Sequence, residues 1–230
     1  MALLSADSFN RANGAAGSTD GAGSLDPKTW TTQSGTWAID TNQLSTTGTV
    51  PAILTCDLAT ADVDITYTHV VSDVNGQGII CRFSDTSNYV FLNGDTTQLR
   101  LQKLVAGSTT NISSLIGPPF LGTNTVVRLV ASGNQFWVYH DGALDPASPY
   151  TDSFNSTATK HGLRHGGTSQ RSDAWSVSSP GSGTTTMTGT RAFETDTARR
   201  GSLPFPSNGQ RVVCVKTETR QEWFAFGPAS

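Results

Sequence analysis

The chain has 230 residues, of which 14% are charged and 36% hydrophobic, and its formal net charge is −3. This charge disfavours a nucleic-acid partner, because binding to phosphates needs a basic patch. No apolar run approaches the roughly 18 residues that span a bilayer, so we expect no membrane insertion. The 33 Thr, 25 Ser and 23 Gly predict strands and turns, since β-branched Thr favours strands and Gly and Ser favour turns.

The first residues do not resemble a signal peptide. Asp7 interrupts the opening apolar stretch after about six residues, which is too short for a secretory core. We therefore expect synthesis in the cytoplasm without export. Cys56, Cys81 and Cys214 lack the CxxC spacing of a zinc site and are too few for a disulfide framework. We expect free thiols, and the alternative is one bridge between Cys56 and Cys81.

Strand patterns follow one another along the chain, and helical periodicity is rare. Residues 63–70 alternate strictly between apolar and polar, and residues 98–104 alternate with leucines on one face. A polar turn at 85–88 predicts a hairpin between its flanking apolar runs. The predicted strands are 37–40, 52–58, 63–70, 78–83, 89–92, 98–104, 126–130 and 136–140. Their spacing of about 8–12 residues is typical of an antiparallel β-sandwich.

The composition changes at Ser178–Gly189, a stretch (SSPGSGTTTMTG) without a periodic apolar face. The predicted organisation is a sandwich at 1–178, a flexible linker at 179–189 and a small module at 190–230. That module has one predicted strand at 211–215, an aromatic ending at 223–226 and the longest candidate helix of the chain at 195–202. Because about forty residues rarely hold a core alone, we expect the module to pack against its own sandwich, a second copy or another protein.

Two stretches resemble known families. Residues 7–177 resemble a concanavalin A-like jelly roll of the laminin-G or glucanase type. The resemblance rests on DSFNRANG at 7–14, Trp30, SGTWAI at 34–39, residues 78–92, WVYHDG at 137–142, GLR at 162–164 and SDAWSV at 172–177. It implies an all-β, antiparallel jelly-roll β-sandwich whose final strand returns beside the first.

The C-terminal stretch Thr195–Phe226 resembles a short module of tailed-bacteriophage tail, fibre and other virion proteins. Its features are TARR at 197–200, the PFPSNG turn at 204–209, the strand 212–215 and EW at 222–223. The Asp-Gly that usually precedes the last Trp of this module is missing. The two resemblances together imply a lectin-like sandwich with a small C-terminal β appendage in a phage virion.

The chemistry of the sequence argues against an enzyme. The glucanase resemblance implies two carboxylates on one strand, but no Glu precedes residue 194. Asp62 and Asp64 have the required even spacing, yet we expect a solvated strand face there. His161 and His165 are spaced as metal ligands of a helix, but the neighbouring glycines favour a polar loop. No G-x-S-x-G elbow is present.

Binding is the remaining chemistry, and the fold resemblance implies a glycan ligand. The residues that we expect to stack on sugar rings are Tyr89, Trp137, Tyr139 and Tyr150. The alternative for the tryptophans is a place in the core. The relatives of this fold often hold one Ca²⁺, which makes calcium the one cofactor to consider, through Asp20, Asp26 and Asp173. The alternative for these aspartates is ordinary Asx turns.

The sequence therefore predicts a structural or accessory virion protein of the minor-tail, fibre or decoration type. Its expected partners are other virion proteins, further copies of itself in a trimer, and a host glycan bound weakly at many copies. The expected location is the virion. The residues that we expect to serve assembly or anchoring are Arg211, Val213, Trp223, Phe224 and Phe226. The alternative is a stand-alone carbohydrate-binding module of a cellular protein.

Overall fold

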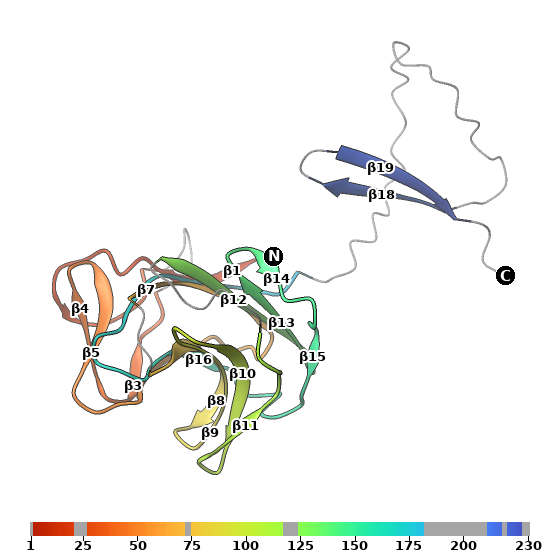
Figure 1. The fold of residues 1–230 in the computed structure, drawn as a ribbon. Coiled ribbons are helices and arrows are strands. Elements are labelled where there is room, and N and C mark those ends of the chain that lie inside the picture. The colour runs from red at the N-terminus through yellow and green to blue at the C-terminus, as the bar shows by residue number, and fades with distance from the viewer. Residues whose placement is uncertain are drawn as a thin grey trace. The chain divides into compact units, whose positions relative to one another are not determined.

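The computed structural model describes residues 2–20, 27–71, 75–116 and 124–181 together with two strands at 211–217 and 220–226 (Figure 1). The chain divides into two compact units, Met1–Thr184 and Thr185–Ser230. The predicted helix at 195–202 and most of the predicted linker lie outside the described residues. The linker bounds of 179–189 therefore stay a prediction, and each unit is described below by itself.

The larger sheet of the first unit has ten strands. Eight follow the order β14-β13-β12-β7-β17-β5-β4-β2, while β1 pairs with β17 and β15 pairs with β13. Every pairing in this sheet is antiparallel. The strands are β1 (Leu3–Asp7), β2 (Gly14–Ala15), β4 (Thr36–Asp40), β5 (Gln43–Thr47), β7 (Val63–Val71), β12 (Thr125–Ser132), β13 (Gln135–His140), β14 (Ala143–Leu144), β15 (Tyr150–Thr151) and β17 (Arg171–Ser178).

The smaller sheet has seven strands in the order β11-β10-β9-β8-β16-β6-β3, again antiparallel throughout. Its strands are β3 (Thr31–Ser34), β6 (Ala52–Asp57), β8 (Gln77–Asp85), β9 (Asn88–Gly94), β10 (Leu99–Val105), β11 (Ser108–Asn111) and β16 (Lys160–His165). The predicted hairpin 78–83/89–92 is confirmed, and the predicted strands 126–130 and 136–140 also pair as a hairpin. The described residues of the first unit contain two antiparallel sheets and no helix, so the predicted β-sandwich is confirmed.

The core lies between the two sheets and follows from strand alternation, which sends successive side chains to opposite faces. In β7, Val63, Ile65 and Tyr67 are fully buried, and in β13 Phe136 and Val138 are. These side chains form one apolar cluster with Trp30, Trp37 and Trp175. Trp37 and Trp175 therefore occupy the core, as the alternative interpretation of the tryptophans predicts.

The first and last strands of the sandwich lie side by side, as the resemblance implies. In the β1–β17 pair, Ser5 lies opposite Val177 and Leu3 opposite Ser178. Beyond the strands, the Ser179 amide donates to the Ala2 carbonyl at 2.7 Å. The two ends of the sandwich are thus fastened to each other.

A buried carboxylate anchors the segment after β1. The side chain of Asp7 is fully buried and accepts hydrogen bonds from Trp30 Nε1 at 2.6 Å and from the Phe9 amide at 2.8 Å. Arg11 adds an ion pair at 2.6 Å. A buried carboxylate is stable only when it is paired and hydrogen-bonded, so these contacts fix the segment against the core.

The structure corrects three expectations about polar and leucine positions. Residues 161–165 do not form a loop. They belong to strand β16, and His161 and His165 are both fully buried. Asp64 is not solvated: it is 6% exposed and forms a two-bond ion pair with Arg128, with both bonds at 2.7 Å. Leu104 does not share a face with Leu99 and Leu101, because its odd spacing from them places it on the opposite face of β10.

Asp62 belongs to a second ion pair, although its side chain is 46% exposed. Its partner Arg82 is fully buried and adopts a positive φ of 55° at an irregularity in the pairing of β8 with β9. The guanidinium also donates to the carbonyls of Ala61 and Gly133 and lies over the Phe136 ring. The predicted solvated face is therefore wrong for Asp64, whereas Asp62 is exposed to solvent but also has a specific arginine partner.

Cys56 and Cys81 are free thiols, as expected, and both are buried. Their strands, β6 and β8, are separated by β16, so the alternative bridge has no support from the topology. Burial raises the pKa of each thiol to about 12. Cys214 lies among residues whose side chains are not described.

The described part of the chain contains no helix that could cross a membrane.

The second unit contains an antiparallel hairpin of β18 (Arg211–Thr217) and β19 (Arg220–Phe226). The strand predicted at 211–215 is thereby confirmed, and the aromatic ending forms its partner strand. In this register Val213 lies opposite Phe224, Cys214 opposite Trp223, and Arg211 opposite Phe226. The five residues expected to serve assembly thus lie on two paired strands, and their assembly role stays a prediction.

Buried histidines make the sandwich sensitive to acid. Neither ring nitrogen of the fully buried His69 has a hydrogen-bond partner within the described residues, while His165 bonds Ser172 Oγ at 2.8 Å. Burial lowers the pKa of His69 and of His161 to about 4, and that of His165 well below 6.5. The folded state therefore favours the neutral imidazoles.

We expect the free energy of unfolding to fall by about 1–2 kcal/mol per buried histidine as the pH drops from 7 to 5. In this window the unfolded chain, with histidine pKa values near 6.5, binds more protons than the folded chain. Urea unfolding of the full chain at several pH values measures the slope. His69→Leu should reduce that slope. An identical slope for wild type and His69→Leu would contradict the argument.

Candidate functional site

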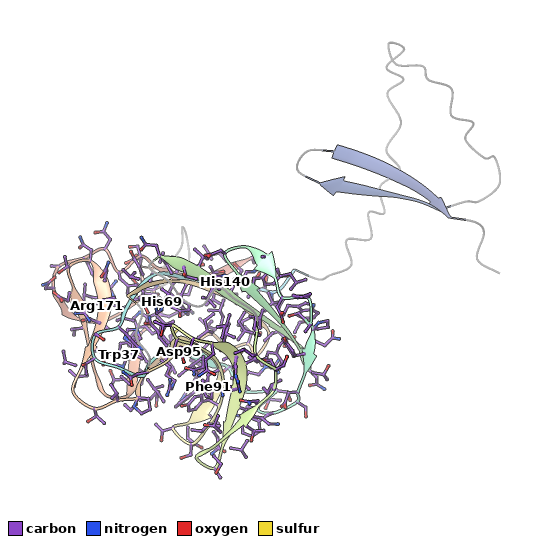
Figure 2. The ribbon with its side chains drawn as sticks, viewed as in Figure 1. Trp37, His69, Phe91, Asp95, His140 and Arg171 are labelled. Carbon is purple, nitrogen blue, oxygen red and sulfur yellow. The ribbon has the colours of Figure 1, made fainter. Side chains whose placement is uncertain are left out.

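The seven-stranded sheet buries apolar side chains on both of its faces. In β9, Val90 and Leu92 point into the main core, whereas Tyr89 and Phe91 belong to a second apolar cluster on the opposite face. We call this opposite face the outer face of the seven-stranded sheet. The members of its cluster are Ile53, Ile80, Phe83, Tyr89 and Phe91, with Leu104 packed against them. Figure 2 shows Phe91 on this sheet and His69 in the interior above it.

Aromatic rings form a continuous row on the outer face. The ring centroids of Phe83 and Tyr89 are 5.8 Å apart and those of Tyr89 and Phe91 are 5.3 Å apart, both within the range of favourable aromatic pairs. Tyr89 is 2% and Phe91 4% exposed. The row is therefore a packed, rigid floor rather than a set of free rings.

Arg164 of β16 extends this row. Its Cζ lies 5.4 Å from the Phe91 ring centroid, a cation–π distance. Its Nη1 donates to Asn93 Oδ1 at 3.2 Å and to the Gly76 carbonyl at 3.3 Å. Burial raises the pKa of Tyr89, against the opposing effects of the Arg164 charge and of a hydrogen bond from Arg164 to the tyrosine oxygen. The guanidinium is thus held in place by a ring, an amide, a carbonyl and a phenol.

A pocket of about 380 Å³ opens on this outer face. Its floor contains Ile53, Tyr89, Phe91, Leu104 and Arg164. Its rim comes from the end of β3, from the loop before β6, from the turns between β8 and β9 and between β10 and β11, and from β11. The rim residues are Ser34, Thr49, Val50, Pro51, Thr86, Gly107 and Thr109. An apolar floor with a few polar groups at fixed positions is the usual composition of a small-molecule site.

The polar groups of the pocket are hydroxyls and one cation. Ser34, Thr49, Thr86 and Thr109 can each donate and accept a hydrogen bond, although the Ser34 hydroxyl already donates to the Pro51 carbonyl at 2.7 Å. Arg164 is the single charged residue in the described lining, which contains no carboxylate. The pocket can therefore bind a hydroxyl-rich molecule, and its electrostatic field favours oxygen acceptors and anions.

The structure brings only one of the four expected sugar-binding residues to this pocket. Tyr89 lines it, but from the floor and almost wholly buried, so the expected exposed stacking ring is not observed. Trp137 and Tyr139 lie on β13, on the side opposite the core residues Phe136 and Val138. They therefore share the outer face of the ten-stranded sheet, where both are half-buried.

Arg128 covers one of these two rings. Its Cζ lies 4.4 Å from the Tyr139 ring centroid, while its guanidinium pairs with Asp64. Tyr150, the fourth expected residue, packs against the main core from β15, and its hydroxyl donates to Asp145. The four residues thus lie in three separate places and do not form one site.

The aspartates considered for calcium have other partners. Asp20 accepts hydrogen bonds from the Ser8 amide and hydroxyl and pairs with Arg11 at 3.3 Å. Asp173 accepts a hydrogen bond from the Ala174 amide, and Asp26 lies outside the described residues. In the described ranges no group of three or more His, Cys, Asp or Glu side chains has the arrangement of a metal site. A calcium role stays untested, and these contacts are not Asx turns either, because Asp20 bonds to Ser8 twelve residues earlier and Asp173 to the amide of the next residue.

Phe91, Leu104 and Arg164 are pocket residues that the sequence analysis missed. The signal for the first lies in Tyr89-Val90-Phe91-Leu92, a run that is apolar at every position. Such a run is typical of a strand buried on both faces. Arg164 has no such local signal, because the ring and the amide that it contacts, Phe91 and Asn93, belong to another strand.

Comparisons with known proteins bear on the fold. No protein-family model matches the chain, and no curated protein matches its sequence. Domain 4 of AbnA, a GH43 extracellular arabinanase from Geobacillus stearothermophilus solved in complex with arabinotriose, matches with a TM-score of 0.50 and 12% identity. That match covers 77% of this chain and 92% of the domain.

Two further solved structures resemble the chain more weakly. The carbohydrate-binding module CBM66 from Bacillus subtilis matches with a TM-score of 0.47 and 19% identity. That match covers 64% of this chain and 90% of the module. The galectin LEC-6 from Caenorhabditis elegans matches with a TM-score of 0.42 and 10% identity. That match covers 57% of this chain and 92% of the galectin. At these identities the likeness concerns the fold alone.

The buried place of Tyr89 gives a direct test of this geometry. We expect Tyr89→Ala to lower the free energy of unfolding by about 3–5 kcal/mol, the usual cost of deleting a buried aromatic ring. Tyr89→Phe should cost only about 1 kcal/mol, because it removes one hydrogen bond and keeps the ring. Urea unfolding curves measure both values. A cost below about 1 kcal/mol for Tyr89→Ala would show that the ring is exposed.

Proposed function

We propose that the protein is a glycan-binding β-sandwich that acts by binding and not by catalysis. The observation that carries this proposal is the pocket on the outer face of the seven-stranded sheet, with its aromatic and aliphatic floor, its hydroxyl rim and one fixed guanidinium. A binding role of this kind needs no cofactor.

The pocket suits the surface of a saccharide. A sugar ring presents C–H groups on its faces and hydroxyls around its edge. Val50, which is 39% exposed, and Leu104 offer apolar contact to the C–H faces, while Thr86, Thr109 and Arg164 offer hydrogen bonds to the hydroxyls. Because the floor residues are packed against one another, little conformational entropy is lost on binding.

The likeness to domain 4 of the arabinanase supports the same reading, since that domain was solved in complex with arabinotriose. The scarcity of carboxylates supports the absence of catalysis. Glycoside hydrolysis usually needs a pair of carboxyl groups flanking the bond, and the described lining of this pocket offers none. All three glutamates of the chain, at 194, 218 and 222, come after the sandwich.

We propose further that the sandwich is carried on the virion of a tailed phage, as a minor tail, fibre or decoration protein made in the host cytoplasm. The support for this setting is the resemblance of Thr195–Phe226 to a virion module. In this proposal the hairpin β18–β19 anchors or trimerises the chain through Arg211, Val213, Trp223, Phe224 and Phe226, and many copies bind a host glycan together. The alternative, a carbohydrate-binding module of a cellular protein, rests on the sandwich and its pocket alone.

Blocking the pocket tests the glycan-binding proposal. Thr109 and Thr110 are neighbouring exposed residues of β11, but only Thr109 lines the pocket. We expect Thr109→Trp to lower glycan affinity at least about tenfold, which corresponds to about 1.4 kcal/mol, and Thr110→Trp to leave it unchanged. A glycan array identifies a bound saccharide, and titration calorimetry compares the variants on it. Equal affinity of the two variants would place binding elsewhere.

Removing the C-terminal module tests the assembly proposal. We expect the full chain to be a trimer and a chain that ends at residue 189 to be a folded monomer, because the proposed contacts between copies lie in 190–230. Light scattering gives the mass of each species, and circular dichroism reports whether the shortened chain keeps its strands. A full-length monomer would contradict trimerisation, and a trimer that persists without the module would assign assembly to the sandwich.

A further inference from the structure

Two arginines lie in one row across the seven-stranded sheet. Arg100 of β10 is paired with Asn93 of β9, Asn93 with Gly78 of β8, and Gly78 with Arg164 of β16. Paired residues of neighbouring strands project to the same face, so both guanidinium groups belong to the outer face that carries the pocket. The side-chain amide of Asn93 lies between them and accepts the Arg164 hydrogen bond.

These two arginines differ from the others of the sandwich. Arg11, Arg82, Arg128 and Arg171 each have an aspartate partner within 4 Å, at Asp7, Asp62, Asp64 and Asp40. Arg100 and Arg164 form no ion pair with any described residue, and the buried Nε of each has no hydrogen-bond partner among them. The sandwich neutralises its other guanidinium groups but leaves two positive charges on the pocket side of one sheet.

The position of Arg164 suits an anion better than a neutral group. Contacts to Phe91, Asn93 and Gly76 hold the guanidinium in place before any ligand binds. An oxyanion in a partly enclosed pocket gains a charge-assisted hydrogen bond, which is about twice as strong as a neutral one. The solvent screening that weakens exposed ion pairs is reduced there.

Building on the proposed glycan-binding function, we propose that the saccharide carries a carboxylate and that Arg164 binds this group. The ligand class is an acidic glycan, with the carboxylate supplied by a uronic acid or by a sialic acid. Ring C–H groups then lie on Val50 and Leu104, and the hydroxyls of Thr86 and Thr109 bind the sugar edge. Arg100 adds attraction along the same row.

Matched polymers separate the carboxylate from the rest of the sugar. The full chain is run in native gels that contain polygalacturonate, alginate, hyaluronan or polysialic acid, and in parallel gels with the carboxyl-reduced form of each polymer. The migration shift gives the affinity. We expect retardation by at least one acidic polymer and at least about tenfold weaker binding to its reduced form, since a hydrogen bond to a charged group contributes about 1.5–3 kcal/mol. The polymer that retards the protein shows whether a uronic or a sialic acid is preferred.

Three variants test the role of Arg164. Arg164→Gln and Arg164→Met, the second of which keeps an apolar chain over Phe91, should each lose about tenfold or more on the acidic polymer. Lys160→Gln removes the same charge from an exposed position four residues earlier on β16 and should retain wild-type binding. Thermal unfolding midpoints identify a variant that fails to fold, in which case the folded arginine variant carries the test.

The outcomes distinguish the inference from the proposed function. Equal affinity for an acidic polymer and its reduced form would overturn the carboxylate inference and leave glycan binding intact. Equal losses in Arg164→Gln and Lys160→Gln would show general attraction of charge and would also overturn it. Failure to bind any polymer in either form, together with a blank glycan array, would overturn the proposed function itself.

Discussion

The alternation of side chains along the strands of the seven-stranded sheet is the constraint on which the rest of the structure depends. A single strand, β9, gives Val90 and Leu92 to the core between the sheets and Tyr89 and Phe91 to the outer face. The same pleat therefore sets the stability of the sandwich and the floor of the pocket. A shift of one residue in the register would exchange these sets and remove both at once.

The pocket and the ten-stranded sheet use arginine in two different ways. Arg128 lies between Asp64 and the Tyr139 ring, so its charge is neutralised and its surface covers an aromatic residue. Arg164 also lies over a ring, but its described partners are neutral acceptors. Among the described residues, arginine is thus neutralised on the outer face of the ten-stranded sheet and left without an ion pair on the outer face of the seven-stranded sheet.

Much of the fold, but little of the site, could be predicted from the sequence. Strict alternation at 63–70 and polar turns between apolar runs are local signals, and they identified the strands and hairpins. The ion pairs of Asp62 and Asp64 are long-range contacts that no local pattern reveals, and the histidines of β16 were hidden by glycines that suggest a loop. Tyr89 was expected to stack on a sugar, whereas its ring packs between Phe83 and Phe91 and is 2% exposed, which are contacts that no local pattern reveals.

The pairing of β1 with β17 has a mechanical consequence. Ala2 and Ser179 lie at the same end of this antiparallel pair and are bonded to each other. A force applied between these two residues therefore loads the interstrand hydrogen bonds one after another, as in a zipper, and not all together as in shear. The sandwich should open by peeling from this corner at low force, while the strands that carry the outer face keep their pairing.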